Sequence, residues 1–264
     1  MATYGILSRE RDKIVNKQEG KYMKVLAFNS SPNVNKGNTA LILNPFLEGM
    51  KGAGAEVELF YAKKLKINPC QGCYNCWIKT PGVCSQKDDM QMLLPKLGEM
   101  DVWVLATPLY VFGMNGPMKN LLDRTIPSAQ PFFELRDGHC CHPGRDGYQR
   151  GKVVLVSNCG FLEMDNFDAL LVHIKALCKN MGREFAGALL RPNGPSMKPM
   201  MEAGLPLDDI FEAAREAGRQ LVEDGEMSAE TLNIVSRELI SPPEKAVHVI
   251  NKYWRQQMNA AGVK

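Results

Sequence analysis

This 264-residue sequence lacks every long apolar segment that would point to a membrane or to export. No stretch approaches the roughly 20 apolar residues that a transmembrane helix needs. The first 23 residues mix charges throughout and contain nothing like the apolar core of a signal peptide. We therefore expect a cytoplasmic protein without a membrane partner, whose cysteines are thiols or ligands rather than disulfides.

An excess of charge of one sign is missing as well. The chain has 32 Lys and Arg against 29 Asp and Glu, which gives a net charge of +3. That balance is too small to argue for nucleic acid or an anionic membrane surface as a partner. The hydrophobic content of 45% can bury a real core. A chain of this length is long enough for one large α/β domain with appendages, or for two small domains.

Two phosphate-binding signatures are also absent. The Walker loop G-x4-G-K-[ST] does not occur, and neither does G-x-G-x-x-G. The second absence argues against a dinucleotide as the tightly held ligand.

Cysteine, by contrast, is concentrated in one place. Four of the eight cysteines lie close together, as Cys70, Cys73, Cys76 and Cys84. The two-residue gaps between the first three are typical of iron-sulfur ligation, in which the thiolates bind different irons of one cluster. Because no second group of four exists, Cys84 would complete the same cluster. Four thiols without metal stay open as an interpretation. So does zinc, although four-cysteine zinc sites normally separate two C-x2-C pairs by a longer spacer.

Five short apolar runs predict a parallel sheet. They are residues 24–29, 56–61, 102–106, 152–157 and 185–190. Residues 167–181 and 207–222 instead repeat apolar side chains at intervals of three and four, which predicts amphipathic helices. Strands that alternate with helices pair in parallel through right-handed crossovers. The expected fold is α/β, a flavodoxin-like doubly wound five-stranded sheet of order 2-1-3-4-5, with a C-terminal helical extension.

The chain divides into three predicted parts: an N-terminal extension at residues 1–22, the main domain at 23–225 with its Cys-rich loop 70–84, and a helical tail at 226–264. The first helix should span residues 39–51 with Asn38 or Thr39 as its cap, and Pro45 should kink it or delay its start. In the tail, Ser228 should cap a short helix. A second helix should follow, and its apolar face should pack on the parent domain or on a second subunit. That face consists of Ala246, Val249, Ile250, Tyr253, Trp254 and Met258.

Three loops that follow strands carry the residue types of a cofactor site. In doubly wound sheets, ligands bind outside the carboxyl ends of the strands at the switch point, here between strands one and three. Residues 29–39 are small and polar and lead into a helix N-terminus, which suits a phosphate. In residues 107–117, Tyr110 and Phe112 offer planar surfaces, unless they are ordinary core aromatics. Residues 157–160 offer small donors, and Cys159 has no evident His partner and is interpreted as a structural thiol.

Four segments together carry a family resemblance. They are Ser30-Ser-Pro with Gly37-Asn-Thr39, the Cys70 to Cys84 run followed by Lys87-Asp-Asp-Met90, Pro108-Leu-Tyr-Val-Phe-Gly113, and Met118-Lys-Asn-Leu-Leu-Asp-Arg124. Their combination resembles the NAD(P)H-dependent FMN reductase group of flavodoxin-like proteins, and within it most of all the iron-sulfur flavoproteins. The resemblance covers about residues 23 to 190.

The resemblance implies a flavin-dependent oxidoreductase with non-covalently bound FMN. The FMN phosphate would bind at Ser30, Ser31, Asn33, Asn38 and Thr39. The isoalloxazine ring would lie against Pro108, Leu109, Tyr110, Val111, Phe112 and Gly113, with its pyrimidine edge near Asn158, Cys159 and Gly160. The resemblance also implies a homodimer or homotetramer. Cys70, Cys73, Cys76 and Cys84 would hold a [4Fe-4S] cluster near a flavin of the same or a neighbouring subunit.

The function we expect is electron transfer between FMN, the cluster and NAD(P)H or a small acceptor, with ferredoxin as a further candidate partner. No side chain is assigned a catalytic role, because the cofactor does the chemistry. Two alternatives are a cluster-free NAD(P)H-dependent FMN or quinone reductase, and a non-enzymatic zinc-stapled interaction domain. Residues 127–150 lie outside the resemblance. Their His139-Cys-Cys-His142 motif is interpreted as part of a lid or subunit contact rather than a metal site.

Overall fold

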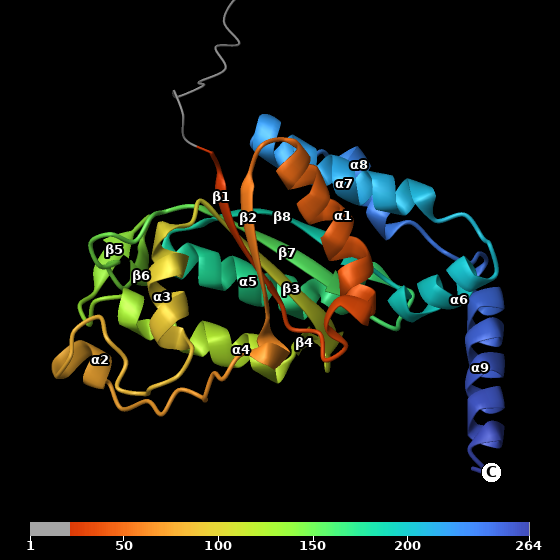
Figure 1. Cartoon of the computed structure of the whole chain (residues 1–264), viewed down its shortest axis with the longest axis horizontal. Helices are drawn as coiled ribbons and strands as arrows, with labels where there is room; N and C mark the ends of the chain where they lie inside the picture. Colours follow the sequence, from red (N-terminus) through yellow and green to blue (C-terminus); the bar gives the residue numbers. More distant parts are fainter. Residues whose placement is uncertain (1–21, 264) are drawn as a thin grey trace, which may run out of the picture.

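A computed structural model describes residues 22–263 of the chain, and the first 21 residues of the predicted extension lie outside this range (Figure 1). Its central sheet has the order β2-β1-β3-β7-β8, and all of these neighbours pair in parallel. The five strands are Glu56–Tyr61, Lys24–Asn29, Val102–Tyr110, Lys152–Asn158 and Glu184–Arg191, in that spatial order. The predicted order 2-1-3-4-5 and the flavodoxin-like fold are confirmed.

Helices cover both faces of the sheet, because side chains along a buried strand alternate between the two faces. On β1, Val25 and Ala27 join the core formed with α1 (Asn38–Gly52) and α7 (Asp208–Glu223). Leu26 and Phe28 face the other core, which contains α3 (Met90–Glu99), α4 (Gly116–Asp123) and α5 (Asp168–Met181). The apolar runs of β1, β3 and β7 are therefore strands that are buried on both sides, and the edge strands β2 and β8 are less buried.

Close packing of α1 on α7 depends on glycines. A Cβ atom added to Gly49 would lie 1.9 Å from the carbonyl oxygen of Arg215, and one added to Gly218 would lie 2.0 Å from that of Phe46. Any side chain at either position would push the two helices apart. The apolar contact between α1 and α7 fixes the first helix against the sheet and so positions the loop that precedes it.

The start of α1 differs from the sequence prediction. The helix begins at Asn38 with Gly37 as its N-cap, so the assignment of the cap to Asn38 or Thr39 was wrong. Pro45 lies inside the helix and does not delay its start. Proline removes one backbone hydrogen bond. Here the buried side chains on both sides of it, including Leu43 and Phe46, hold the segment in helical form.

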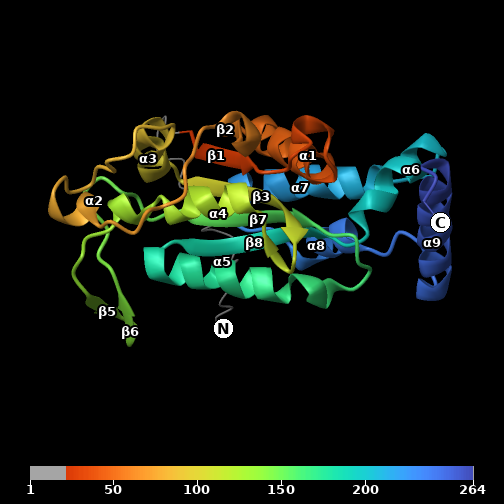
Figure 2. The ribbon, with the colours of Figure 1, turned by 90° about the horizontal axis from the view of Figure 1, so that it is seen from below.

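The strand after α3 is longer than predicted, because β3 continues to Tyr110 and turns back into β4 (Gly113–Met114). The turn consists of Val111 and Phe112, with φ of 48° and 60°. A tight turn with two positive φ angles normally takes glycine or asparagine, so these two residues are held in a strained backbone conformation. A further hairpin, β5 (Glu134–Arg136) with β6 (His139–Cys141), projects from the body and was not predicted (Figure 2).

The tail contains the two predicted helices, α8 (Ala229–Ser236) and α9 (Pro243–Ala260). Ser228 caps α8 as predicted, since its side chain accepts from the amide of Thr231. Val235 of α8 is part of the α1–α7 core, whereas α9 extends away from the body and buries only Ala246 fully (Figure 1). The boundary at residue 225 stays a prediction. None of the helices within residues 22–263 is long and apolar enough to cross a bilayer.

The remaining helices are short. They are α2 (Asn75–Ile78), α6 (Met197–Glu202), and five 3-10 turns at Val34–Lys36, Ala62–Lys64, Ile126–Ser128, Met164–Phe167 and Gly194–Ser196.

Candidate functional site

Side-chain hydrogen bonds join the loops that follow β1, β3 and β7. The hydroxyl of Ser30 donates to the carbonyl of Ala106 at 3.2 Å, and Asn115 Nδ2 donates to the carbonyl of Ser30 at 2.6 Å. Asn158 Nδ2 donates to Thr39 Oγ1 at 2.7 Å. The sheet order thus brings together three loops that lie up to 119 positions apart in the sequence. Sequence reasoning missed Asn115, whose role depends on contacts far along the chain.

The predicted phosphate loop has the features that an anion needs. Ser30, Ser31 and Thr39 are buried, Asn38 is half-buried and Asn33 is exposed. Gly37 provides no side-chain cap, so the amides of Asn38 and Thr39 have no partner among the described residues, while the amide of Ala40 donates to the carbonyl of Gly37 at 3.0 Å. A Cβ atom added to Gly37 would lie only 2.3 Å from Ser31 Oγ. The free amides at the start of α1 and the small residues Ser31 and Gly37 beside them fit a phosphate group. Helix N-termini bind phosphate through their N–H groups and the helix dipole.

Lysines add positive charge beside this loop. Residues 32–35 line a hollow together with four lysines, Lys36, Lys63, Lys64 and Lys198. Lys63 Nζ donates to the carbonyl of Pro32 at 2.9 Å, and Lys198 Nζ donates to the carbonyl of Lys36. Sequence reasoning missed these lysines because they come from three segments that only the fold brings together. Their charge favours an anion at this end of the molecule.

The predicted ring site is exposed. Tyr110 and Phe112 are 51% and 49% exposed, so the alternative that they are ordinary core aromatics is excluded. Phe112 stacks on Phe161 from the loop after β7, with ring centroids 6.0 Å apart and planes 7° from parallel. Because both side chains are about half exposed, they border a surface that a flat heteroaromatic group could cover.

The third predicted segment lies beside the first two. Asn158 and Cys159 are buried and Gly160 is exposed. Cys159 Sγ donates to the carbonyl of Phe161 at 3.5 Å. Burial raises the pKa of Cys159, which disfavours the thiolate and agrees with the interpretation of this residue as a structural thiol.

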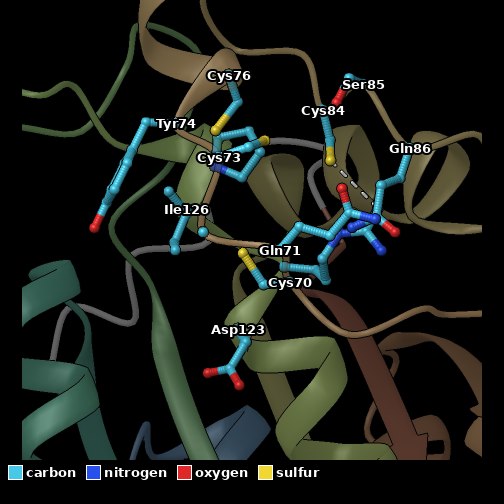
Figure 3. A pocket seen from close by; sticks show the side chains of 13 residues that line it. Cys70, Gln71, Cys73, Tyr74, Cys76, Cys84, Ser85, Gln86, Asp123 and Ile126 are labelled. Carbon is cyan, nitrogen blue, oxygen red and sulfur yellow. Dashed lines mark hydrogen bonds between the residues drawn. The ribbon is translucent and has the colours of Figure 1, made fainter.

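The four clustered cysteines line one small cavity (Figure 3). Cys76 is buried on α2, Cys84 is half-buried, and Cys70 and Cys73 are exposed. In Figure 3 the sulfur atoms of all four surround the same space. Burial raises the pKa of Cys76, and the nearby Cys84, Cys73 and Cys70 raise it further through charge repulsion. None of the eight cysteines forms a disulfide, and all of them lie in the part of the chain that the structure describes.

One guanidinium group holds both ends of the cysteine loop. Arg124 Nη1 donates to the carbonyl of Asn68 at 2.7 Å and to Asp88 Oδ2 at 2.6 Å, while Nη2 donates to Cys84 Sγ at 3.5 Å. Burial alone would raise the pKa of Asp88, but hydrogen bonds from Arg124 and the Asn68 amide hold it below its usual range. Sequence reasoning noted both segments as motifs but not this contact between them.

The His139-Cys-Cys-His142 motif does not converge on a point. Cys140 is exposed and Cys141 is buried, because adjacent residues of β6 face opposite sides. The ring of His142 packs against Trp77 and Phe133, with centroids 5.0 Å from each. Within residues 22–263, no group of three His, Cys, Asp or Glu side chains is arranged to hold a single metal ion.

The flavin loops and the cysteine cavity lie at opposite ends of α4. The helix starts directly after β4, and Asp123 at its end lines the cysteine cavity. Eight helical residues span about 12 Å, at 1.5 Å per residue. Within one chain, the length of α4 therefore separates the two predicted sites.

The comparisons with known proteins agree with this geometry. The family model for NADPH-dependent FMN reductases matches residues 23–172, which include the phosphate loop, the cysteine loop and the β3–β4 turn. The chain belongs to this FMN reductase family. An iron-sulfur flavoprotein of Archaeoglobus fulgidus is 40% identical over 115 residues, which cover 44% of this chain and 55% of the relative. Another iron-sulfur flavoprotein, of Methanocaldococcus jannaschii, is 35% identical over 115 residues, which cover 44% of this chain and 58% of the relative.

The chain thus matches a little over half the length of these two relatives.

Solved structures support the FMN reductase fold. An FMN-dependent NADH-azoreductase from Bacillus anthracis, in complex with FMN, has a TM-score of 0.58 at 16% identity and covers 76% of this chain and 99% of its own. An NAD(P)H:quinone oxidoreductase from Methanothermobacter marburgensis has a TM-score of 0.50 at 18% identity. The match covers 76% of this chain and 96% of the oxidoreductase.

Proposed function

We propose that this FMN reductase family member is an iron-sulfur flavoprotein that transfers electrons between NAD(P)H or a small acceptor and a [4Fe-4S] cluster. The FMN would accept two electrons at a time from a nicotinamide and pass them singly to the cluster. In this proposal the protein's residues bind and orient both groups, and none of them acts as an acid or base. Ferredoxin is a further candidate partner.

The flavin part of the proposal is supported by the loops at the switch point. The uncapped start of α1 and the buried hydroxyls of Ser30, Ser31 and Thr39 suit the phosphate of FMN. The exposed Tyr110 and Phe112 would be covered by the flat ring, which would remove apolar surface from water. Asn158 and the backbone at Cys159 and Gly160 would meet the polar edge of the ring.

The cluster part is carried by one observation: Cys70, Cys73, Cys76 and Cys84 line a single cavity that Arg124 closes on one side. Four thiolates so close together repel one another, and a positively charged metal core removes that repulsion. A hydrogen bond from a guanidinium to a ligating sulfur is one of the contacts by which a protein tunes the reduction potential of a cluster. Curated relatives named iron-sulfur flavoproteins agree with this assignment.

A cluster-free NAD(P)H-dependent FMN or quinone reductase is the second candidate function. The exposure of Cys70 and Cys73 favours it, because it leaves two of the four thiols open to solvent. The fold likeness to an azoreductase and to a quinone oxidoreductase is compatible with the same candidate.

Protein purified without oxygen distinguishes the two candidates. The proposal expects flavin absorption with a broad iron-sulfur shoulder that dithionite bleaches, and about four irons and four sulfides per chain, as a cubane requires. Cys73→Ser should remove iron and sulfide and leave the flavin in place. Cys140→Ser, at an exposed thiol outside the cysteine loop, should keep both. Iron-free protein that retains NAD(P)H-driven flavin turnover would support the cluster-free reductase, and colourless protein that binds no FMN would overturn both candidates.

A homo-oligomer is also part of the proposal. The apolar face of α9 stays largely uncovered by the parent domain, with Trp254 57% exposed and Tyr253 and Met258 also exposed. A stripe of large apolar side chains on a projecting helix is typical of an interface. A neighbouring subunit could then supply the flavin nearest to the cysteine cavity.

A further inference from the structure

A second cavity, of about 700 Å³, lies beside the cysteine loop and beneath the segment that carries the β5–β6 hairpin. Four arginines line it: Arg136, Arg145, Arg150 and Arg183. Figures 1 and 2 place this hairpin and α2 at the end of the molecule away from α9. The flavin loops and the cysteine thiols do not form its walls. Its volume falls in the range of small-molecule sites, roughly 300–1,000 Å³.

Two of these guanidinium groups, those of Arg136 and Arg150, approach the same glycine, and that of Arg183 lies beside a second glycine. A Cβ on Gly182 would lie 2.8 Å from Arg136 Nη1 and 3.6 Å from Arg150 Nε. A Cβ on Gly151 would lie 3.1 Å from Arg183 Nη1. The like charges of Arg136 and Arg150 repel one another at this range, so the arrangement favours an anion beside Gly182.

Arg183 gives independent support for an anion. It is only 6% exposed, it stacks over the Trp103 ring at 4.1 Å, and its Nη2 donates to the carbonyl of Met100 at 2.7 Å. Its Nε has no hydrogen-bond partner among the described residues. Burial lowers the pKa of Arg183 to about 10, although Cys178 and Asp101 act in the opposite direction. A buried cation that lines a cavity and has no carboxylate partner is costly unless a negative group approaches its guanidinium.

The protein's own carboxylates leave most of this charge unbalanced. Arg136 pairs with Glu134, and the lining residue Asp123 is already paired with Lys119. Among the residues that the structure describes, Arg145, Arg150 and Arg183 form no ion pair. Asp146 is the one further acidic residue that lines the cavity, and it is exposed.

The walls also indicate an organic ligand rather than an inorganic ion. Trp77 and Tyr148 line the cavity, and both are only partly buried. Aromatic faces next to arginines suit a planar ring that carries an anionic group. We propose that this cavity binds a planar organic anion, with a phosphate or carboxylate held by Arg145, Arg150 and Arg183 and the ring against Trp77 and Tyr148.

The cavity borders the cysteine site. Tyr74, Asp123 and Ile126 line both cavities, and Arg145 Nη2 donates to the carbonyl of Cys76 at 3.5 Å. A bound anion would therefore contact the segment that holds the four thiols. The proposal does not depend on the presence of the cluster or on flavin activity.

Calorimetry on the FMN-loaded protein at fixed ionic strength tests the proposal with three probes. AMP carries a ring and a phosphate, phthalate carries a ring and carboxylates, and adenosine carries a ring without charge. At least one of the two anions should bind with a Kd below about 1 mM, and adenosine should not bind. Which anion binds more tightly identifies the anionic group that the site prefers. If neither anion binds, or adenosine binds equally well, the proposal is wrong.

Arginine variants locate the binding. Arg150 is exposed, so Arg150→Ala should fold normally and weaken binding about tenfold, as the loss of one charge-assisted hydrogen bond predicts. Arg255→Ala removes an equal charge from exposed α9 and should leave the Kd unchanged. Arg183→Lys keeps the buried charge but loses the planar guanidinium that can bind a phosphate or carboxylate through two N–H groups, so it should also weaken binding while thermal unfolding shows that the fold is intact. Equal affinities in the wild type and Arg150→Ala would overturn the assignment.

Discussion

Arg124 and Asp88 form a two-pronged ion pair that is almost fully removed from water. Nη1 lies 2.6 Å from Oδ2 and Nη2 lies 2.9 Å from Oδ1, and the two side chains are 1% and 0% exposed. Through Asn68 and Cys84, the same guanidinium reaches both ends of the cysteine loop. The pair therefore anchors that loop to the end of α4.

Breaking this pair should destabilise the protein and loosen the cysteine loop. Arg124→Ala leaves a buried carboxylate without its cation, with only the amide groups of Asn68 and Met90 still donating to it, which costs about 3–5 kcal/mol in the free energy of unfolding. Arg124→Lys keeps the charge but not the two-pronged geometry and should lose less. Urea unfolding measures the free energy, and iron retention after anaerobic gel filtration measures the hold on a cluster.

Lys119→Ala provides the matched control for the Arg124 variants. Lys119 lies on the same helix and pairs with Asp123 at the surface, so its loss should change stability by about 0.5 kcal/mol or less. If Arg124→Ala proves no more harmful than Lys119→Ala, the anchoring role is wrong.

Gly37→Ala should weaken FMN binding. The new Cβ would lie 2.3 Å from Ser31 Oγ and would displace that side chain from the predicted phosphate loop. Loss of one or two hydrogen bonds to a charged phosphate corresponds to an affinity about 10- to 100-fold lower. Quenching of FMN fluorescence by the apoprotein measures the Kd. Gly52→Ala, at the other end of α1 with nothing within 4 Å, should leave the Kd unchanged, and a similar loss in both variants would contradict the prediction.

Trp254→Glu should disrupt a homo-oligomer. Trp254 and Tyr253 lie on the uncovered face of α9, and a carboxylate buried in an apolar interface is strongly unfavourable. Light scattering after gel filtration should show a lower mass for this variant than for the wild type. Lys252→Glu changes an already charged, exposed position on the same helix and should assemble normally. Identical masses for the wild type and Trp254→Glu would remove α9 from the interface.

Tyr148 should make stability fall at high pH. Burial raises the pKa of Tyr148 to about 12, although Arg145 acts in the opposite direction, and its hydroxyl donates to the carbonyl of Leu94 at 3.2 Å. In the unfolded chain the pKa is about 10. Between pH 10 and 12 the unfolded state therefore loses the proton while the folded state keeps it, so stability drops as the pH rises through this window.

Tyr148→Phe measures this contribution. The variant loses one hydrogen bond at neutral pH but lacks the titration, so its stability should fall less steeply than that of the wild type above pH 10. The difference should be on the order of 1–3 kcal/mol by pH 12. Chemical unfolding at a series of pH values tests it, and parallel curves for the two proteins would show that Tyr148 does not titrate differently on folding.

Local residue patterns were enough to predict the main sheet and the loops at its switch point. The runs that begin at Lys24, Val102 and Lys152 are strands because continuous apolar sequence is buried on both faces, whereas the run that begins at Glu56 is a half-buried edge strand. The alternation of strands with helices sets the parallel order. The same patterns predicted Ser228 as a helix cap, since a cap is a contact between residues close in sequence. The cap of α1 was predicted wrongly because Gly37 has no side chain to mark it.

The sequence by itself therefore determined what repeats locally: strands, most helices, and a spacing of cysteines that points to one cavity. Only the tertiary structure decided which distant groups meet. The contacts of Arg124 with Asp88 and of Asn115 with Ser30, and the arginines around Gly182, join segments tens of positions apart. Such contacts leave no period in the sequence, because a side chain's partner across the fold is set by the packing of whole elements.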